Sequence, residues 1–461
     1  MLKAQASTER LRILMVADDC NPEWHSLPAL VYNYICKVAD YADVVLVTQI
    51  RNKPNIDAAG MGKAQVVYLN TENVAAPIYK LASFLSGDPN LAMTLKVAFS
   101  YPTSLAFEWA VWRHFRQDLK AERFDIVHRV SPMSPTIPSL LASWSPIPVV
   151  IGPVLGGLAW PAQFKQEMKR EGEWMNYVRQ AHRWLPFYKS TYARAAAILA
   201  AYDHTISDLP ALAADRIINF SEGGVDPSLF PLPDRQEKDK MTVVFVGRLV
   251  PFKLPEVVIR SFAASPILRQ HKLVMVGDGP ERPRLEQIVQ EAGLSECVEF
   301  AGTISQQQVG QLMRESEIFA FPSIREQGGG VLTLAMMSGM TCLVVDYGGP
   351  ATRVAPGCGV KVPLGDVDHL VRFYTEELEA LVQDPKRVIE LGRAGRRFTE
   401  TYYSWERKAQ KTLEIYSWVL GRQAEKPDFW APPSSFLSVE GLKKLEDSVE
   451  LREDREGATS T

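Results

Sequence analysis

Short apolar strands that alternate with helix-length segments are the feature that most constrains the fold of this chain. In the first half, β-branched runs predict five buried strands, at 13–17, 44–48, 65–69, 126–128 and 149–151. In the second half, five more are predicted at 242–246, 273–276, 298–300, 318–321 and 342–346. Continuous apolar strands separated by helices are typical of a parallel sheet covered on both faces. The sequence therefore predicts an α/β protein with two doubly wound domains.

The length and the linkers suggest where these domains begin and end. At 461 residues the chain exceeds what one hydrophobic core usually organises. A polar stretch at 233–240 precedes the second series of strands. We expect a first domain at 1–208, a second at 209–404, and a tail at 423–461 that is mostly disordered or docked on the surface.

Composition restricts the partners and the compartment. The formal net charge of −3 gives no reason to expect a nucleic-acid partner. The five cysteines are scattered without the spacing of metal ligands, which argues against a zinc site and a disulfide framework. The N-terminus lacks the apolar core of a signal peptide, and no run reaches the roughly 18 apolar residues that span a bilayer. These features predict a cytoplasmic protein without a metal centre.

Glycines and cations follow several strands of the second series. Gly247 and Arg248 follow the strand at 242–246, and Lys253 lies five residues after Arg248. An arginine fork and a lysine point charge suit a diphosphate, although a surface loop with two solvated cations is an equal alternative. After the next strand come Gly277 and Gly279, a weak signal alone. A dinucleotide fingerprint would require a third glycine where Arg282 stands, which counts against an NAD site.

The segment FPSIREQGGGV at 321–331 is the strongest single signal. Gly328, Gly329 and Gly330 precede a predicted helix that begins at Val331, so bare backbone amides meet a helix N-terminus. Such an arrangement binds phosphate oxygens. Glu326 is placed to accept hydrogen bonds from the hydroxyls of whatever the phosphate carries; a flexible loop with a capping acid is the alternative. We therefore expect a phosphorylated ligand at the carboxyl ends of these strands.

These motifs, taken together and in order, resemble the retaining glycosyltransferases of the two-domain B fold, family 4 (glycosyl transferases group 1). The resemblance rests on EGGVDPSLF at 222–230, FVGRLVPFK at 245–253, VGDGPERPRLE at 276–286 and FPSIREQGGGVLTLAMMSGM at 321–340. Residues 405–422 resemble the family's helix that crosses back onto the first domain. The resemblance implies a GT-B type fold, in which two Rossmann-like domains face a central cleft.

The resemblance also implies a function. The chain would transfer a sugar from a nucleotide-diphosphate sugar, of the UDP or GDP type, to a glycan or lipid-linked acceptor in polysaccharide or glycolipid synthesis, with retention of configuration. The matching positions imply the following roles. Arg248, Lys253 and Glu326 would bind the diphosphate and the sugar, and His128 would face the sugar. Donor-binding backbone would come from Gly247, Gly277, Gly279, Gly328, Gly329, Gly330 and Val331, and the base would lie near Gly302, Thr303 and Ile304. A metal ion would not be required, because Arg248 and Lys253 neutralise the phosphates.

Two departures from the family pattern bear on activity. Leu334 stands where the family has a second glutamate that holds the ribose, and an apolar side chain cannot accept those hydrogen bonds. Val130 replaces the second histidine of an HxH element whose first member is His128, so a core histidine is an equal alternative for His128. Two other functions therefore stay open: a catalytically weak, sugar-nucleotide-binding partner of a glycan assembly complex, and an inverting enzyme or epimerase of the same architecture.

Cations and aromatic residues interleave over residues 164–194. On a helix, such a mixture suits an anionic membrane surface. The alternative is an amphipathic helix packed on the first domain. The first interpretation predicts peripheral contact with the cytoplasmic face of a membrane.

Overall fold

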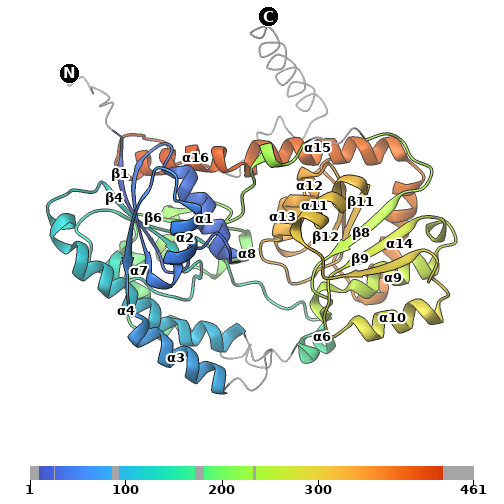
Figure 1. Cartoon of the computed structure of the whole chain (residues 1–461), viewed down its shortest axis with the longest axis horizontal. Coiled ribbons are helices and arrows are strands. Elements are labelled where there is room, and N and C mark those ends of the chain that lie inside the picture. Colours follow the sequence, from blue (N-terminus) through green and yellow to red (C-terminus); the bar gives the residue numbers. More distant parts are fainter. Residues whose placement is uncertain (1–9, 25, 86–92, 172–180, 232–234, 429–461) are drawn as a thin grey trace, which may run out of the picture.

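The computed structural model describes residues 10–24, 26–85, 93–171, 181–231 and 235–428. Two parallel sheets lie side by side, each flanked by helices (Figure 1). The first has seven strands in the order β3-β2-β1-β4-β5-β6-β7, and the second has six in the order β10-β9-β8-β11-β12-β13. The predicted fold class, two doubly wound α/β domains, is confirmed.

The first sheet consists of β1 (Arg12–Ala17), β2 (Asp43–Gln49), β3 (Gln65–Leu69), β4 (Ile126–Ser131), β5 (Val149–Val154), β6 (Ala197–Ala200) and β7 (Ile217–Asn219). Its helices are α1 (Leu27–Val38), α2 (Lys53–Ala59), α3 (Glu72–Leu85), α4 (Met93–Lys120), α5 (Leu140–Trp144), α7 (Tyr188–Arg194) and α8 (Asp203–Asp208). Alternate residues of β1 enter two different cores: Ile13 and Met15 pack on one face of the sheet, and Leu14 and Val16 pack on the other. Burial on both faces explains why the strand is apolar throughout.

The second sheet consists of β8 (Thr242–Val246), β9 (Lys272–Val276), β10 (Val298–Gly302), β11 (Ile318–Phe321), β12 (Thr341–Val345) and β13 (Val360–Val362). Its helices are α9 (Pro255–Ala264), α10 (Arg282–Glu291), α11 (Gln306–Glu315), α12 (Gly330–Met337), α13 (Gly348–Arg353), α14 (Val367–Val382) and α15 (Pro385–Tyr403). Three predicted strands, 242–246, 318–321 and 65–69 of the other sheet, match the observed bounds.

The predicted boundary between the domains at 208/209 is too early. β7 pairs with β6 in the first sheet, so the first domain continues at least to Asn219. The prediction missed β6 and β7 because the first is alanine-rich and the second has only three residues. α16 (Trp405–Val419) then returns to the first domain and packs against α1 (Figure 1).

Residues 164–194 do not form one helix. α6 (Lys165–Arg170) packs beside η6 (Pro251–Lys253) of the second domain, whose core also includes Phe164. Residues 172–180 lie outside the described part of the chain, and η3 (Ala181–Trp184) and α7 follow on the first domain. The predicted tail lies outside the described residues from 429 onward. None of the helices described here has both the length and the apolar character required to cross a membrane.

Candidate functional site

The turns after neighbouring strands of the second sheet are tied together at its carboxyl edge. The Gly247 amide donates to the carbonyl of Val276 at 3.0 Å, and the Gly277 amide donates to the carbonyl of Gly302 at 2.8 Å. A Cβ added at Gly277 would lie only 2.0 Å from the Gly247 carbonyl oxygen. Glycine is therefore required for this close approach, and three successive turns form one surface. A ligand on this surface can contact several turns at once.

Lys253 and Glu326 form an ion pair on this surface. The Lys253 ammonium donates to Glu326 Oε2 at 2.7 Å, and the two side chains are only 13% and 22% exposed. The ammonium also lies 4.8 Å from the centre of the Phe321 ring. A backbone hydrogen bond from the Ile324 amide to the Phe252 carbonyl joins the two loops. The structure thus brings together a cation and an acid that the sequence placed 73 residues apart.

Residues 328–330, here called the glycine turn, lead into α12, and their backbone amides are not used by the helix. Gly329 has a φ of 64°, which is left-handed and favours glycine. Within the described residues, the amides of Gly329, Gly330 and Val331 have no hydrogen-bond acceptor, and a Cβ at Gly330 would meet nothing within 4 Å. Open amides at a helix N-terminus can bind an anion. The turn therefore has the chemistry of a phosphate cradle, a few residues from the Glu326 carboxylate.

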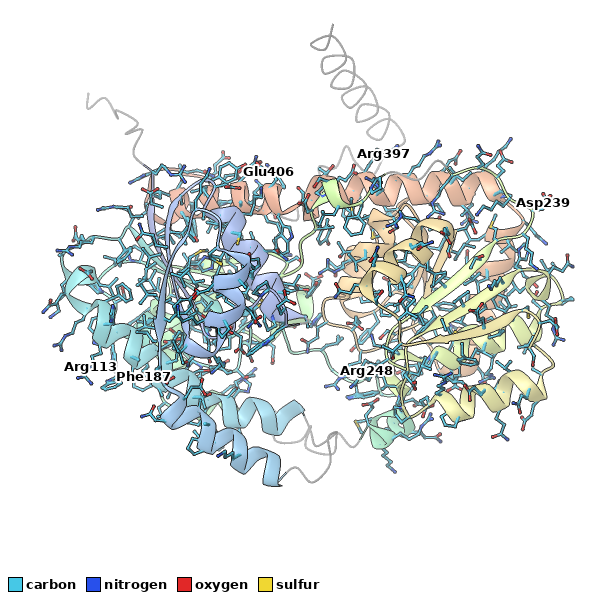
Figure 2. The ribbon with its side chains drawn as sticks, in the orientation of Figure 1. Arg113, Phe187, Asp239, Arg248, Arg397 and Glu406 are labelled. Carbon is cyan, nitrogen blue, oxygen red and sulfur yellow. The ribbon has the colours of Figure 1, made fainter. Side chains whose placement is uncertain are left out.

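Arg248 and Leu334 lie exposed on the same domain. Figure 2 shows Arg248 on the side of the second domain nearest the first. Its guanidinium has no ion-pair partner in the described part of the chain, so it is available to an anionic ligand. Leu334, on α12, is 37% exposed. The leucine side chain has no hydrogen-bond acceptor, so Leu334 cannot bind the hydroxyl groups of a ligand as a glutamate would.

The predicted base-binding residues lie at the end of β10. Gly302 has a φ of 66°, Thr303 is exposed, and Ile304 packs against the core of the second domain. Gly279 lies on the neighbouring turn, where an added Cβ would be 2.4 Å from the carbonyl oxygen of Leu249. These residues follow β9 and β10 at the same carboxyl edge of the sheet as Gly247.

The first domain contacts the loop that carries Glu326. The Tyr347 hydroxyl donates to the carbonyl of Ala159 at 2.8 Å, and the Arg325 guanidinium lies 5.1 Å from the centre of the Trp160 ring. A Cβ at Gly348 would be 2.9 Å from the Leu158 side chain. Residues 158–160 of the first domain thus pack against the two loops of the second domain that carry Arg325 and Tyr347.

A buried polar network that the sequence did not reveal joins both domains beside the glycine turn. The Arg353 guanidinium donates to Glu222 Oε1 at 3.0 Å, to the Tyr202 hydroxyl at 2.8 Å and to the carbonyl of Gly328. The Tyr202 hydroxyl in turn donates to Glu222 Oε2 at 3.0 Å. Tyr202 follows β6, Glu222 lies in the connection between the domains, and Arg353 ends α13. The glycine turn is therefore fixed to the connection between the domains.

Lys408 of α16 adds a second cation to this network. Its ammonium donates to the carbonyls of Ser221 and Gly223, and its side chain is buried. Burial lowers the pKa of Lys408 to about 7, the negative charge of Glu222 raises it, and the Arg353 charge lowers it further. The returning helix is thus polar at the point where it meets the connection between the domains.

His128 lies in the core of the first domain. Its side chain is fully buried, with Nδ1 2.6 Å from the Tyr416 hydroxyl and Nε2 2.8 Å from the carbonyl oxygen of Gly152. Burial lowers the pKa of His128 to about 4. Both ring nitrogens have partners, so this geometry favours the core histidine over a histidine that faces a sugar.

Comparison with known proteins gives the fold and a family match for part of the chain. Residues 233–398 match the family described as Glycosyl transferases group 1. D-inositol 3-phosphate glycosyltransferase of Gordonia bronchialis is 30% identical over 194 residues, which cover 39% of this chain and 41% of that protein. The chain thus spans about two fifths of the length of the curated relatives it matches first.

Solved structures resemble nearly the whole described fold. Sucrose-phosphate synthase of Thermosynechococcus elongatus has a TM-score of 0.58 at 18% identity, covering 90% of this chain and 100% of that one. Anabaena HepE, solved in complex with UDP, has a TM-score of 0.57 at 16% identity, covering 88% of this chain and 100% of that one. The chain therefore has the two-domain GT-B fold, and its second domain matches the group 1 glycosyl transferases.

Proposed function

We propose that this protein is a retaining glycosyltransferase of the family 4 type, which transfers a sugar from a UDP or GDP sugar to a glycan or lipid-linked acceptor. The observation that carries the proposal is the Lys253–Glu326 pair beside the open amides of the glycine turn. A diphosphate on this surface would meet a cation, an arginine fork from Arg248 and bare N–H groups. Glu326 could then accept hydrogen bonds from the sugar hydroxyls.

The proposed chemistry relies on stabilising the leaving group. Cleavage of the bond between the sugar and the phosphate leaves an oxocarbenium-like sugar next to a diphosphate. The acceptor oxygen attacks from the same face, and its proton passes to the departing phosphate oxygen. Lys253 and Arg248 would neutralise the charge that develops on the diphosphate, so a metal ion would not be required. Activity in the presence of EDTA tests this last point.

The donor base is proposed as uracil in the first instance. Anabaena HepE shares the fold and was solved with UDP and with UDP-glucose, which supports a uridine nucleotide here. We infer a cytoplasmic location and an acceptor in polysaccharide or glycolipid synthesis from the family resemblance. Contact of residues 164–194 with a membrane remains part of this proposal, although Arg170 pairs with Glu281 and Arg183 pairs with Asp208.

The first experiment is a thermal-shift titration with UDP, GDP and ADP on the wild type and on Lys253→Ala. A ligand that binds only the folded state at about 100 times its Kd stabilises it by about 2.7 kcal/mol. We expect a shift with UDP that Lys253→Ala loses. Lys361→Ala is the matched control, because Lys361 forms an ion pair with Asp346 in the same domain. Equal shifts in all three proteins would contradict the proposed donor site.

The catalytically weak partner is the second candidate, and the exposed Leu334 favours it. The two candidates differ in product formation. Incubation with UDP-glucose and a panel of acceptors should release UDP together with a glycoside of retained anomeric configuration, detected by NMR. Nucleotide binding without product across UDP and GDP sugars would favour the partner. Inverted configuration would instead favour the inverting alternative.

A further inference from the structure

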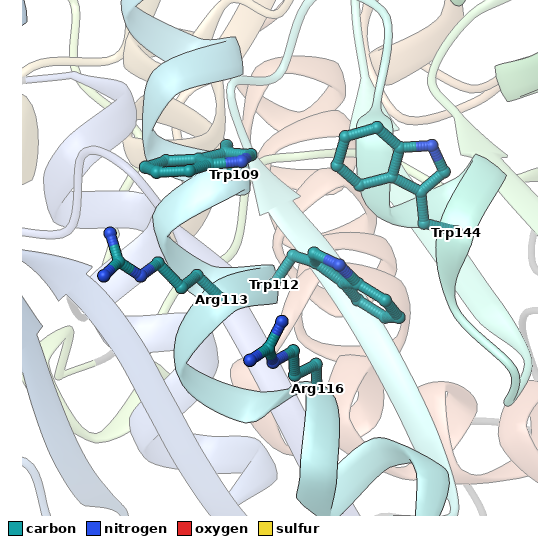
Figure 3. A pocket seen from close by; sticks show the side chains of 5 residues that line it. All are labelled: Trp109, Trp112, Arg113, Arg116 and Trp144. Atoms are coloured by element: carbon teal, nitrogen blue, oxygen red, sulfur yellow. The ribbon is translucent and has the colours of Figure 1, made fainter.

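Tryptophan and arginine side chains surround a cavity of about 360 Å³ on the first domain (Figure 3). The lining residues, here called the tryptophan–arginine surface, are Trp109, Trp112, Arg113, Arg116 and Trp144. The first four are spaced i, i+3, i+4 and i+7 along α4, so they share one face of that helix. Trp144 belongs to α5. A single helix face and its neighbour therefore present all five side chains together.

The apolar part of this surface is open to water. Trp109 is 49% exposed and Trp144 is 39% exposed. The Trp144 ring lies 6.2 Å from that of Trp112 and 5.9 Å from that of Phe187. Trp184, three residues before Phe187, is 91% exposed. Clustered exposed indoles mark an interaction site, because monomeric proteins rarely leave such a patch uncovered.

The charged part of this surface is cationic and uncompensated. Arg113 lies 5.5 Å from the centre of the Trp109 ring, and neither Arg113 nor Arg116 has an ion-pair partner among the described residues. The two acids of α4 are engaged elsewhere. Glu108 is buried and accepts a hydrogen bond from the Ser139 hydroxyl, and Asp118 pairs with Arg123. The partner of this surface should therefore carry negative charge.

The combination of indoles and guanidinium groups identifies the kind of partner. Indoles prefer the boundary between lipid headgroups and acyl chains, where the ring is apolar and its N–H remains hydrated. An arginine fork binds phosphate in a bidentate manner, and anionic leaflets attract clustered cations. We propose that the tryptophan–arginine surface docks the first domain on an anionic phospholipid bilayer. Arg113 and Arg116 contact lipid phosphates, and Trp109 and Trp144 enter the headgroup region.

This surface is separate from the candidate donor site. Figure 2 shows Arg113 and Phe187 on the part of the first domain remote from Arg248. The inference extends the membrane contact of the proposed function to a surface whose five lining residues lie outside 164–194, although Trp144 contacts Phe187 of that range. The inference rests on the proposed function only for the reason that the protein would need a membrane. Binding to vesicles requires neither a sugar donor nor catalysis.

The test is co-sedimentation of the full chain with vesicles of phosphatidylcholine alone or with about 30% phosphatidylglycerol added. We expect binding to the anionic vesicles that weakens with salt. The double variant Arg113→Glu/Arg116→Glu should lower the partition coefficient at least about tenfold. Trp109→Ala/Trp144→Ala should lower it as well and should remove a blue shift in tryptophan fluorescence on binding. All four substituted side chains line an open cavity, and unchanged melting temperatures would verify folding.

Arg372→Glu is the matched control, because Arg372 of α14 is exposed and stacks 5.0 Å from the centre of the Phe373 ring. It should bind vesicles as the wild type does. Three results would overturn the proposal: no binding of the wild type to anionic vesicles, an unchanged partition coefficient for Arg113→Glu/Arg116→Glu, or an equal decrease for Arg372→Glu. Capture of an acidic peptide instead of vesicles would also overturn it. The thermal shift of each variant with UDP tests the donor site independently, so a failure of the membrane proposal can be distinguished from a failure of the proposed donor site.

Discussion

Replacing Arg353 by methionine should destabilise the protein and weaken the donor site at the same time. Arg353 is 1% exposed and donates to groups from both domains, including the Gly328 carbonyl and the Glu222 carboxylate. Methionine fills a similar volume but leaves the Glu222 charge without its guanidinium. It also removes the hydrogen bond from Arg353 to the Gly328 carbonyl, which fixes the glycine turn. The substitution therefore removes one ion pair and one positional constraint.

The magnitude follows from burial. Breaking a buried ion pair by removing one partner costs about 3–5 kcal/mol. In domains of this size, each kcal/mol lowers the melting temperature by about 2–4 °C, so a decrease of about 6–20 °C is expected. The loosened turn should also raise the Kd for UDP by at least about tenfold, since a charge-assisted hydrogen bond contributes about 1.5–3 kcal/mol.

Differential scanning fluorimetry and calorimetric titration with UDP, below the melting temperature of each variant, measure the two effects. Arg235→Met is the control, because Arg235 is also buried and donates to the carbonyls of Met313 and Ser338 within one domain. It should lower the melting temperature without changing the Kd. Equal Kd values for Arg353→Met and the wild type would refute the inference that Arg353 positions the glycine turn.

Three further predictions concern single side chains. Leu334→Glu should tighten UDP binding about 2–10-fold by calorimetry, because one added hydrogen bond to the ribose contributes about 0.5–1.5 kcal/mol. Because the pKa of Lys408 is lowered to about 7, the free energy of unfolding of the wild type should increase as the pH rises from about 7 towards 10.5. Over that range Lys408 stays protonated in the unfolded chain and loses its proton in the folded protein. Denaturant titrations should therefore show that this dependence of the unfolding free energy on pH is lost in Lys408→Met. His128 should make the wild type less stable as the pH falls from 6.5 to about 4, because only the unfolded state gains the proton there. His128→Gln should lose this dependence in thermal melts and keep the pH profile of nucleotide binding.

Each of these predictions has an outcome that contradicts it. Unchanged or weaker UDP binding by Leu334→Glu would place the ribose away from α12. A pH slope that persists in Lys408→Met would assign the slope to other groups. Loss of nucleotide binding in a folded His128→Gln protein would return His128 to the donor site.

Ten of the strands could be predicted because each of them carries its own signal in the sequence. β11 is apolar throughout and β8 is apolar after Thr242, and a proline and a glycine follow them, so the pattern alone located their bounds. β6 and β13 lack that signal, since alanine and a short length are compatible with many structures. They become strands because β5 and β12 offer neighbouring edges. Tertiary context decides these elements, and a single sequence does not show it.

The candidate site divides in the same way. Lys253, Glu326 and the glycine turn could be identified because each lies next to a strand end with a distinctive local composition. Arg353 and Glu222 lie 131 residues apart. Glu222 begins the motif at 222–230, but that motif does not indicate a buried partner, and Arg353 lies outside every motif. Only folding brings them together. The position of His128 in the core likewise depends on Tyr416, which arrives from the returning helix.

The glycine turn at 328–330 is attached to the connection between the domains. A Cβ added at Gly328 would lie 2.0 Å from Glu222 Oε1, so the turn packs directly on the connection between the domains. The Gly328 carbonyl accepts a hydrogen bond from Arg353, while the amides of Gly329, Gly330 and Val331 have no acceptor among the described residues. An anion bound to these amides therefore touches a segment whose other side is fixed to Tyr202 of the first domain through Glu222. Any rotation of the domains must strain this network or move the turn, so the geometry of the glycine turn depends on the relative position of the domains.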